Sequence, residues 1–262
     1  MKLSIVIAAY NEEAYIGKCL QAVLLQKKAL NNRAIEVIVV NNASTDRTKE
    51  VAASYESVIV VDEQQKGLVR ARQAGYVAST GDIIANLDSD VWLTEAWIEK
   101  IFAEFEKDKK LVGLSGPYVY PEMSCIFNGV VRFWYGIGLI FHFCNQYILR
   151  RGAMMQGGNF VVRRAAMEKI GGFDTTIEFY GEDTDIACRI QKVGKVKFTY
   201  ALPMFTSNRR FKGEGIAKTA FNYGINFIWP VVFGRPFSFS HNDFREGKRV
   251  LTHHAKKEHR KR

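Results

Sequence analysis

The chain has 262 residues, of which 47% are hydrophobic, 24% charged and 13% aromatic. A chain of this composition can bury a large core, which excludes a wholly disordered protein. Its length fits one large domain or two small ones. Its four cysteines are widely spaced and form no CxxC pair, which excludes a small disulfide scaffold.

The net charge of +10 is concentrated near the C-terminus. Residues 245–262 hold eight Lys and Arg against two Glu, a net charge of +6, so the rest of the chain carries +4. A basic tail on a nearly balanced body predicts an anionic partner, either lipid headgroups or nucleic acid. A solvated terminus is the alternative. The N-terminus has no cleavage site after its short apolar run, so we expect no signal peptide and a chain that faces the cytosol.

Short β-branched runs alternate with helical patterns through the first 106 residues. The expected strands and helices alternate at 3–9, 14–28, 35–40, 44–55, 58–61, 69–78, 82–87 and 94–106. Ser44 or Thr45 is the expected cap of the second helix, and Thr94 that of the fourth. This alternation predicts an α/β fold with a doubly wound, mostly parallel sheet and helices on both faces. Ligands of such sheets bind beyond the carboxyl ends of the strands.

The second half of the chain has a different character. Residues 124–151 are rich in aromatic side chains, and 133–149 contain no formal charge. A helix is expected at 164–170, ended by Gly171 and Gly172, and an acidic patch follows at 178–185. A second aromatic run at 221–239 precedes the basic tail. Because no linker-like segment is present, we expect one compact body with a C-terminal addition.

The sharpest chemical signal is Asp88-Ser89-Asp90, directly after a predicted buried strand. Two carboxylates at positions i and i+2 can converge on a hard cation where the chain leaves extended geometry. Mg²⁺ and Mn²⁺ take one or two protein carboxylates and complete their shells with water and substrate phosphates. A turn is the alternative for these residue types, and the position after a buried strand favours the metal.

Polar residues also follow the other predicted strands. The segment 10–12 follows the first strand, and Asn41-Asn42, which follows the second, could hydrogen-bond a base or ribose. Gly67, Arg70 and Arg72 open the next helix, and a helix N-terminus with arginines can hold phosphate. Ordinary turn chemistry and a solvated arginine face are the respective alternatives.

A second acidic cluster is formed by Glu182, Asp183 and Asp185. A carboxylate in an apolar neighbourhood can act as a general base on a hydroxyl. The alternative is a set of acids that faces the dipole of a helix at 183–193. The chain has no GxxxxGK[ST] motif and no GxGxxG after its first strand, so the sequence does not favour an ATPase or a dinucleotide oxidoreductase.

The segment 126–149 has two faces at helical spacing. One face is apolar: Val130, Phe133, Trp134, Ile137, Ile140, Phe141, Cys144 and Ile148. The other is mainly polar: Asn128, Arg132, Tyr135, Leu139, His142 and Gln146. A membrane-spanning helix needs about 20 predominantly apolar residues, so this one is not expected to span. We expect it to lie in a membrane interface; a helix packed on the catalytic body is the alternative.

Taken together, the motifs resemble those of family 2 inverting glycosyltransferases with the GT-A fold. The resemblance covers about residues 2–196 and rests on six segments in order: SIVIAAYNEE, VVNNASTD, KGLVRARQAG, LDSD, GGNFVVRR and GEDTDIACRI. Asn41 and Asn42 stand where the family usually has two acids, so a base contact at Asn42 would use an amide oxygen. A UDP-sugar is the expected donor, with thymidine and guanosine donors left open.

The resemblance implies roles for individual residues. It places the nucleotide-sugar at Ala8, Tyr10, Glu12, Asn42, Gly67, Arg72, Asp88 and Ser89. It implies Mg²⁺ or Mn²⁺ at Asp90 and Asp88, and acceptor-side roles for Gly158, Asn159 and Arg189. Asp183 would be the catalytic base, beside Glu182 of the same motif, with Asp185 as a competing candidate.

The implied organisation has three parts: residues 1–120 for the nucleotide-sugar, 121–200 for the acceptor, and 201–262 for the aromatic segment and tail. The implied reaction is a metal-dependent, inverting transfer of a sugar to a lipid-linked or cell-envelope glycan hydroxyl. We therefore expect a cytoplasmic protein, peripheral on the inner face of the membrane and bound to an anionic surface, with no nucleic-acid partner. The alternatives are a catalytically silent nucleotide-sugar-binding protein and a nucleotidyltransferase. A nucleotidyltransferase would want a Gly- and Lys/Arg-rich loop after the first strand, which AAYNEE does not supply.

Overall fold

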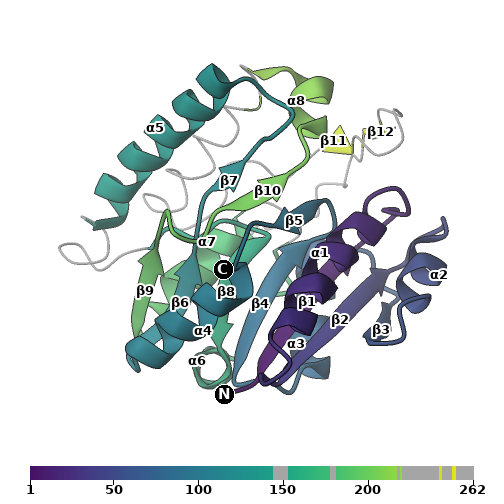
Figure 1. Cartoon of the computed structure of the whole chain (residues 1–262), viewed down its shortest axis with the longest axis horizontal. Helices are drawn as coiled ribbons and strands as arrows, with labels where there is room; N and C mark the ends of the chain where they lie inside the picture. The colour runs from purple at the N-terminus through teal and green to yellow at the C-terminus, as the bar shows by residue number, and fades with distance from the viewer. Residues whose placement is uncertain (144–152, 178–180, 217–218, 220–241, 244–249, 252–262) are drawn as a thin grey trace, which may run out of the picture.

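The computed structural model describes residues 1–143, 153–177, 181–216, 219, 242–243 and 250–251 (Figure 1). Its helices are α1 Ile16–Ala29, α2 Thr48–Ala53, α3 Leu68–Ala78, α4 Trp97–Lys107, α5 Cys125–Phe143, α6 Arg164–Ile170, α7 Glu182–Ile190 and α8 Arg209–Glu214. Its strands are β1 Leu3–Ala9, β2 Ile35–Asn42, β3 Val58–Glu63, β4 Ile83–Asp88, β5 Val91–Leu93, β6 Leu111–Ser115, β7 Tyr118–Val119, β8 Asn159–Arg163, β9 Lys195–Phe198, β10 Met204–Thr206, β11 Asn242–Asp243 and β12 Val250–Leu251.

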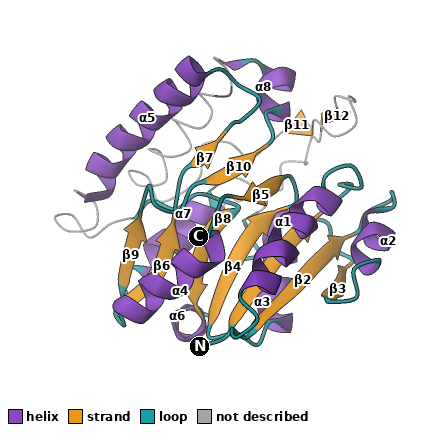
Figure 2. Cartoon of the chain, in the orientation of Figure 1, coloured by secondary structure: helices purple, strands orange, loops and turns teal. Residues whose placement is uncertain are grey.

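Seven strands form one sheet in the order β3-β2-β1-β4-β8-β6-β9 (Figure 2). All neighbouring pairs are parallel except those of β8, which runs antiparallel to both β4 and β6. The predicted mostly parallel sheet is therefore confirmed. Strands β8, β6 and β4 are neighbours, so the same sheet joins the segments 1–120 and 121–200. The register pairs Ala8 with Asp88 and Ala9 with Asn41, which brings three predicted site segments to one edge.

Helices cover both faces of this sheet. Successive side chains of a strand point to opposite faces, and in the buried strands both sets are apolar. Ile5, Ile7 and Val39 belong to the core that packs on α1 and α4, where Trp97 and Phe102 are fully buried. On the other face, α3, α6 and α7 pack over a second set: Val6, Ile38, Val40, Ile84, Phe160 and Val162. Two cores share one sheet, so strand positions are fixed from both sides.

Two helices begin later than expected because their predicted caps bind elsewhere. The hydroxyl of Ser44 accepts a hydrogen bond from the backbone N–H of Asn11 (3.1 Å), and α2 starts only at Thr48, whose N–H is accepted by Asp46 (3.0 Å). Thr94 donates its hydroxyl to the carbonyl of Pro203 (2.6 Å), and α4 starts at Trp97. The predictions of caps at Ser44, Thr45 and Thr94 are therefore wrong.

A small sheet, β5-β10-β7, lies at the carboxyl ends of the parallel strands, with α5 and α8 beyond it (Figure 1). Strand β10 pairs antiparallel with β5, which directly follows the Asp88–Asp90 segment, and parallel with β7. Phe211 of α8 meets Tyr120 and Phe127 edge to face, with ring centroids 5.0 and 5.1 Å apart. These contacts join the segment around residue 210 to α5.

Helix α5 packs on the body with its polar face and turns its apolar face outward. Asn128 accepts the N–H of Tyr120 (2.9 Å), Tyr135 donates to Gln156 (2.7 Å), and buried His142 accepts the N–H of Met154 (2.9 Å). In contrast, Phe133, Trp134 and Ile140 are 65%, 63% and 66% exposed. Residues 144–149 of the predicted amphipathic segment, the aromatic run 221–239 and almost all of the basic tail lie outside the described residues. Among the helices that the structure describes, none is long and apolar enough to cross a membrane.

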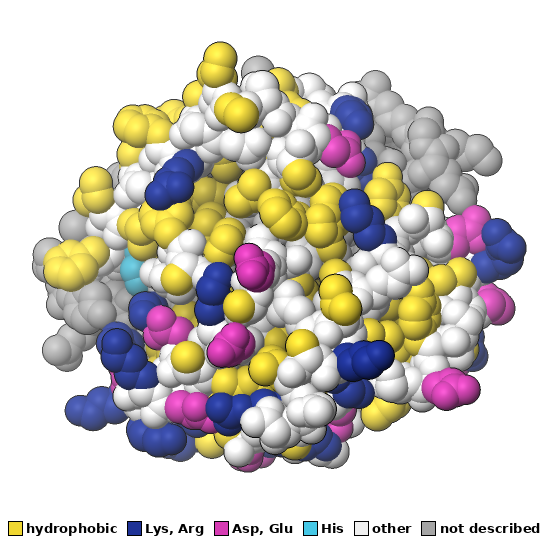
Figure 3. Space-filling view, viewed as in Figure 1, with side chains coloured by type: hydrophobic (Ala, Val, Ile, Leu, Met, Phe, Trp, Pro, Cys, Tyr) yellow, Lys and Arg dark blue, Asp and Glu magenta, His cyan; other side chains and the backbone are white. Residues whose placement is uncertain are grey.

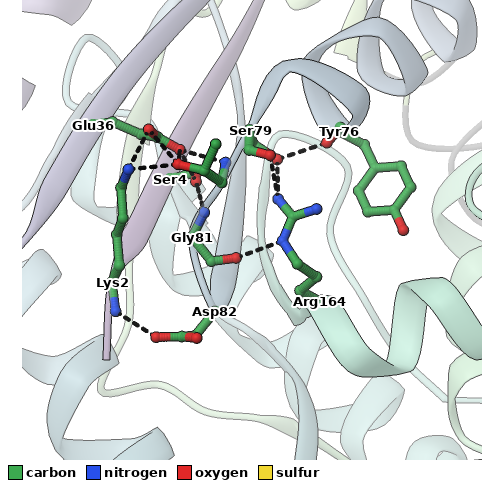
Figure 4. A network of polar contacts seen from close by, with 9 residues as sticks. Lys2, Ser4, Glu36, Tyr76, Ser79, Gly81, Asp82 and Arg164 are labelled. Carbon is green, nitrogen blue, oxygen red and sulfur yellow. Dashed lines mark hydrogen bonds and ion pairs between the residues drawn. The ribbon is translucent and has the colours of Figure 1, made fainter.

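At the opposite end of the sheet, a polar network ties the starts of β1, β2 and β4 together (Figure 4). Glu36 accepts hydrogen bonds from the Ser4 hydroxyl (2.5 Å) and the Thr80 N–H (2.6 Å), and it pairs with Lys2 (2.7 Å). Arg164 donates to the carbonyls of Gly81 (2.7 Å) and Ser79 (2.6 Å). The network lies away from the carboxyl ends of the strands, so it belongs to the fold and not to the candidate site.

Candidate active site

The structure brings most of the predicted residues to the carboxyl edge of β1, β2 and β4. Ala8 and Asp88 are register partners, and Glu12, Asn42, Arg72 and Ser89 are buried around them. Lys66 lies over the ring of Tyr10, 3.9 Å from its centroid. These residues come from four segments of the chain that meet only in the fold.

The side chain of Asn42 is committed to the loop after β3. It donates to the carbonyls of Glu63 (3.1 Å) and Gln65 (2.8 Å), and its oxygen accepts the N–H of Gly67 (2.7 Å). Gly67 has φ +155°, a backbone conformation that side chains rarely adopt. In this structure Asn42 therefore shapes the loop that opens α3. Neighbouring Asn41 donates to Asp62 (2.8 Å), and its own oxygen is buried without a hydrogen-bond partner among the described residues.

Arg72 is 1% exposed and bridges two carboxylates from different motifs. It donates to Asp88 Oδ1 (2.9 Å) and forms an ion pair with Glu182. Burial disfavours its charge, but Glu182 and Asp88 outweigh that effect and raise the pKa of Arg72 above its ordinary value. A buried guanidinium with a fixed fork holds two acids in a defined geometry. Arg72 therefore connects the Asp88–Asp90 segment to the second acidic cluster.

Tyr118 adds a second connection that the sequence analysis did not identify. Its hydroxyl donates to the carbonyl of Gly157 and lies 3.4 Å from Asp88 Oδ2. Gly158 follows at φ +75°, and a Cβ there would overlap Asp88 Oδ2 and lie 2.5 Å from the Tyr118 hydroxyl. The expected acceptor-side Gly158 thus faces the carboxylate of Asp88 directly, and a glycine is needed for that approach.

Arg209, at the start of α8, is the second unpredicted residue of the site. Its guanidinium donates two hydrogen bonds to Glu12, of 2.8 and 2.6 Å, and its Nε lies 3.0 Å from Asp90 Oδ2. Asp90 also accepts the hydroxyl hydrogen of Ser207 (2.6 Å). Arg209 follows a three-residue strand in a basic stretch, and nothing in the sequence separates it from neighbouring Arg210.

The second acidic cluster opens α7. Asp183 accepts the N–H of Gly157 (3.1 Å) and of Thr184 (2.8 Å), and Glu182 pairs with Arg72. Burial raises the pKa of both carboxyl groups, and for Glu182 burial together with the charge of Asp183 raises the pKa to about 7, although Arg72 opposes this. Raised pKa values in a buried pair are typical of acid–base sites. Asp183 and Tyr118 both bind the backbone of Gly157, Asp183 at its N–H and Tyr118 at its carbonyl. Gly157 therefore links Asp183 to the residue that contacts Asp88.

Three other predicted residues support the site from a distance: Arg189, Asp185 and Asn159. Arg189 pairs with Asp185 (2.6 Å) and donates to the carbonyls of Ile170 (3.1 Å) and Gly172 (2.7 Å), so it fastens α7 to α6. Asn159 is completely buried: its amide donates to the carbonyls of Gly116 and Leu202, and its oxygen accepts the indole N–H of Trp97. The side chain of Asn159 is therefore bound within the core behind the site.

The carboxylates of Asp88 and Asp90 fit a divalent cation of the Mg²⁺ or Mn²⁺ type. Asp88 ends β4 and Asp90 stands two residues later. Their side chains are 35% and 15% exposed, which leaves oxygens within reach of a ligand. Among the described residues, no group of three or more His, Cys, Asp or Glu side chains is placed to hold a metal. A two-carboxylate set suits an ion whose remaining ligands are water and phosphate oxygens.

Comparison with known proteins decides the family. The model of "Glycosyl transferase family 2" matches residues 4–171. The chain belongs to glycosyl transferase family 2. All six motif segments either lie in this range or, for the second acidic cluster, follow it by about ten residues.

A curated relative is also a glycosyltransferase, and solved structures share the fold. Glycosyltransferase AglE of Haloferax volcanii is 34% identical over 126 residues, which cover 46% of this chain and 41% of AglE. The chain spans less than half the length of the first curated relatives that it matches. The mannosyltransferase PcManGT from Pyrobaculum calidifontis, in complex with GDP-Man and Mn²⁺, gives a TM-score of 0.61 at 19% identity and covers 78% of this chain and 56% of its own. S. aureus TarS 1–349 in complex with UDP-GlcNAc gives 0.55 at 16% identity and covers 79% and 58%. These likenesses confirm the GT-A fold.

Proposed function

We propose that the protein transfers a sugar from a nucleoside-diphosphate sugar to an acceptor hydroxyl with inversion at the anomeric carbon. The observation that carries this proposal is the double connection between Asp88 and the Glu182–Asp183 pair, through Arg72 and through the Tyr118–Gly157 contact. It holds an acidic donor-side segment and a candidate base side by side. Family membership supports the same reaction class.

The donor would lie along the carboxyl edge formed by Ala8, Tyr10, Gly67 and Asp88, and a UDP-sugar is the donor we expect. Solved neighbours of the same fold carry GDP-Man in one case and UDP-GlcNAc in another. Asp90 and Asp88 would hold Mg²⁺ or Mn²⁺. When bound, the ion neutralises charge on the diphosphate leaving group. Because Asn42 binds the loop at 63–67, it would set the shape of the base site.

Asp183 would take the proton of the acceptor hydroxyl as its oxygen attacks the anomeric carbon and the bond to the diphosphate breaks. One base and no covalent intermediate give inversion. Burial raises the pKa of Asp183, so its carboxylate is a better proton acceptor than an exposed aspartate. Two backbone N–H groups, from Gly157 and Thr184, hold the carboxylate in place. The ion pair with Glu182 keeps Arg72 close to Asp183.

The Asp183→Asn substitution tests the base. We expect transfer to fall by about 10²–10⁴-fold, while affinity for the nucleotide stays within about twofold of wild type because Asp183 lies on the acceptor side. Asp185→Asn is the matched control: it removes a carboxylate two residues along the same helix that pairs with Arg189. Full transfer by Asp183→Asn, or equal loss in both variants, would refute the assignment.

Donor binding is tested by thermal unfolding with a panel of nucleoside diphosphates and their sugars, with and without Mn²⁺. A ligand at 100 times its dissociation constant adds about 2.7 kcal/mol to the free energy of unfolding. We expect a Mn²⁺-dependent shift with uridine nucleotides that is lost in Asp90→Ala. A shift without turnover would favour the alternative of a silent sugar-nucleotide binder, and release of pyrophosphate from a nucleoside triphosphate would favour a nucleotidyltransferase.

We also propose a lipid-linked or cell-envelope glycan acceptor and a peripheral location on the cytoplasmic face of an anionic membrane. The support is the exposed apolar face of α5, seen as hydrophobic side chains along its outer margin in Figure 3, together with the +6 charge of residues 245–262. Apolar side chains beside basic charge are the features that bind anionic bilayers. Failure to bind anionic vesicles at low salt would contradict this part of the proposal.

A further inference from the structure

Arg209 lies between two acidic residues that belong to the donor side of the site. Its terminal nitrogens bind both oxygens of Glu12, at 2.8 and 2.6 Å, while Nε faces Asp90 Oδ2 at 3.0 Å. Glu12 is almost fully buried, and the guanidinium also lies 5.0 Å from the centroid of the Tyr15 ring. One guanidinium is therefore shared between Glu12 and Asp90.

The two contacts of Arg209 are unequal. The fork to Glu12 uses two hydrogen bonds, the arrangement in which an arginine binds a carboxylate most firmly. The contact with Asp90 uses one nitrogen, and the same oxygen also accepts the hydroxyl of Ser207. Arg209 can thus release Asp90 and still be held by Glu12.

We propose that Arg209 is a built-in cation that competes with a divalent metal ion for Asp90. This inference rests on the proposed use of Asp90 as a metal ligand. The Oδ2 oxygen of Asp90 already accepts the hydroxyl of Ser207 and pairs with Arg209. A metal ion bound to the Asp90 carboxylate either competes with these partners for Oδ2 or, at the other oxygen, meets the positive charge of Arg209 at short range. A nucleoside diphosphate brings negative charge that offsets this repulsion. The metal ion therefore binds weakly alone and well together with the nucleotide.

The test measures Mn²⁺ binding by electron paramagnetic resonance, without nucleotide, in wild type and in Arg209→Met. We expect Arg209→Met to tighten Mn²⁺ binding about tenfold or more, since it removes both the competitor and the repulsion. Lys212→Met is the matched control, because it removes one positive charge from the same helix at an exposed pair with Glu122. Mn²⁺ affinity that is unchanged or weaker in Arg209→Met, or equally tightened in Lys212→Met, would overturn the inference.

Arg209→Met leaves Glu12 buried without this partner and could therefore fail to fold. A second pair of variants keeps the inference testable in that case. The double variant Glu12→Gln/Arg209→Met removes both charges, and it should bind Mn²⁺ more tightly than Glu12→Gln alone. UDP binding in the presence of Mn²⁺, measured by calorimetry, separates the two proposals. No Mn²⁺ binding in any variant, with UDP still bound, would overturn the inference and leave the transferase proposal standing. Failure of wild type to bind any nucleoside diphosphate of the panel would remove the transferase proposal itself.

Discussion

Glu182 and Asp183 are neighbours in the chain, yet their carboxyl groups have different partners. Glu182 pairs with the guanidinium of Arg72, whereas Asp183 accepts two backbone N–H groups. Burial raises the pKa of both. This difference supports the proposed roles, with Glu182 as electrostatic support and Asp183 as the base.

The stability of Glu182→Gln relative to wild type should increase as the pH rises. Burial and Asp183 raise the pKa of Glu182 from 4.5 to about 7, so its contribution to stability is fully present below pH 4.5 and is lost as the pH rises through about 7. Gln does not titrate. The free energy of unfolding of Glu182→Gln relative to wild type should therefore increase by roughly 1–3 kcal/mol between pH 5 and pH 8. Thermal unfolding across this range checks it; a difference that does not change with pH would contradict it.

Gly158 and Gly171 offer a matched pair for testing the approach to Asp88. Both have φ near +75°, but a Cβ at Gly158 would overlap Asp88, whereas a Cβ at Gly171 meets nothing within 4 Å. Gly171→Ala should lose about 1 kcal/mol of stability through backbone strain, and Gly158→Ala should lose more because its Cβ also overlaps Asp88. Only Gly158→Ala should also lose Mn²⁺-dependent nucleotide binding, measured by calorimetry. Equal nucleotide affinity in the two variants would show that the Gly158–Asp88 approach does not shape the site.

The residues that the sequence analysis missed have no local pattern. Tyr118 and Arg209 lie 30 and 197 positions from the acids they contact, Asp88 and Glu12. Neither stands in a motif of characteristic spacing, so only the fold reveals them. Asn159 shows the reverse: its motif predicted an acceptor-side role, and the structure places its amide in hydrogen bonds within the core.

Among the elements, strands were easier to predict than helix starts. The strand at Leu3–Ala9 and the helix at Arg164–Ile170 have the expected limits, because a β-branched run buried on both faces and a Gly-Gly stop are local signals. The expected starts of α2 and α4 were wrong because Ser44 and Thr94 bind the backbone of distant segments instead. A cap residue has one side chain, and tertiary partners compete for it.

The orientation of α5 could not be read from its periodicity. The two predicted faces exist, but the sequence does not say which one meets the body, and hydrogen bonds of Asn128, Tyr135 and His142 turn the polar face inward. Periodicity indicates that a helix is two-faced, whereas the direction depends on partners elsewhere in the chain.

The double substitution Phe133→Ser/Trp134→Ser should separate stability from membrane binding. Both side chains are mostly exposed, so the free energy of unfolding should change by less than about 0.5 kcal/mol. Binding to anionic vesicles should weaken at least about tenfold, because two aromatic anchors are lost. Co-sedimentation with vesicles measures this. As a control, a substitution of buried Phe102 should instead lower the free energy of unfolding and leave vesicle binding unchanged. Unchanged vesicle binding in the double variant would remove α5 from the membrane proposal.

In the whole molecule, the two ends of the central sheet differ: one holds a polar network and the other the candidate site. The amino ends of β1, β2 and β4 are joined by Lys2, Glu36 and Asp82, and the carboxyl ends hold the candidate site (Figures 1 and 4). The strands between them are buried on both faces. Stability and binding can therefore be altered independently from opposite ends.

Glu36→Gln should lower stability without changing nucleotide affinity. Burial raises the pKa of Glu36, but hydrogen bonds from Lys2, Ser4 and Thr80 outweigh it and lower the pKa to about 2. Its contribution is thus present above pH 4.5 and is lost as the pH falls through about 2. We expect a loss of about 1 kcal/mol at pH 7, discounted for exposure, which disappears in acid. Chemical unfolding at several pH values, with nucleotide titration at pH 7, tests both parts. Weaker nucleotide binding would contradict the separation.

The pairing of Glu12 with Arg209 also has a consequence for how the protein is made. The two residues are separated by 197 positions, and at about 5–20 residues per second a ribosome needs roughly 10–40 s to add them. During that interval β1 and its neighbours can already assemble, while the buried carboxylate of Glu12 lacks its arginine. In the nascent chain the residues of β1 are therefore present well before the arginine that pairs with Glu12.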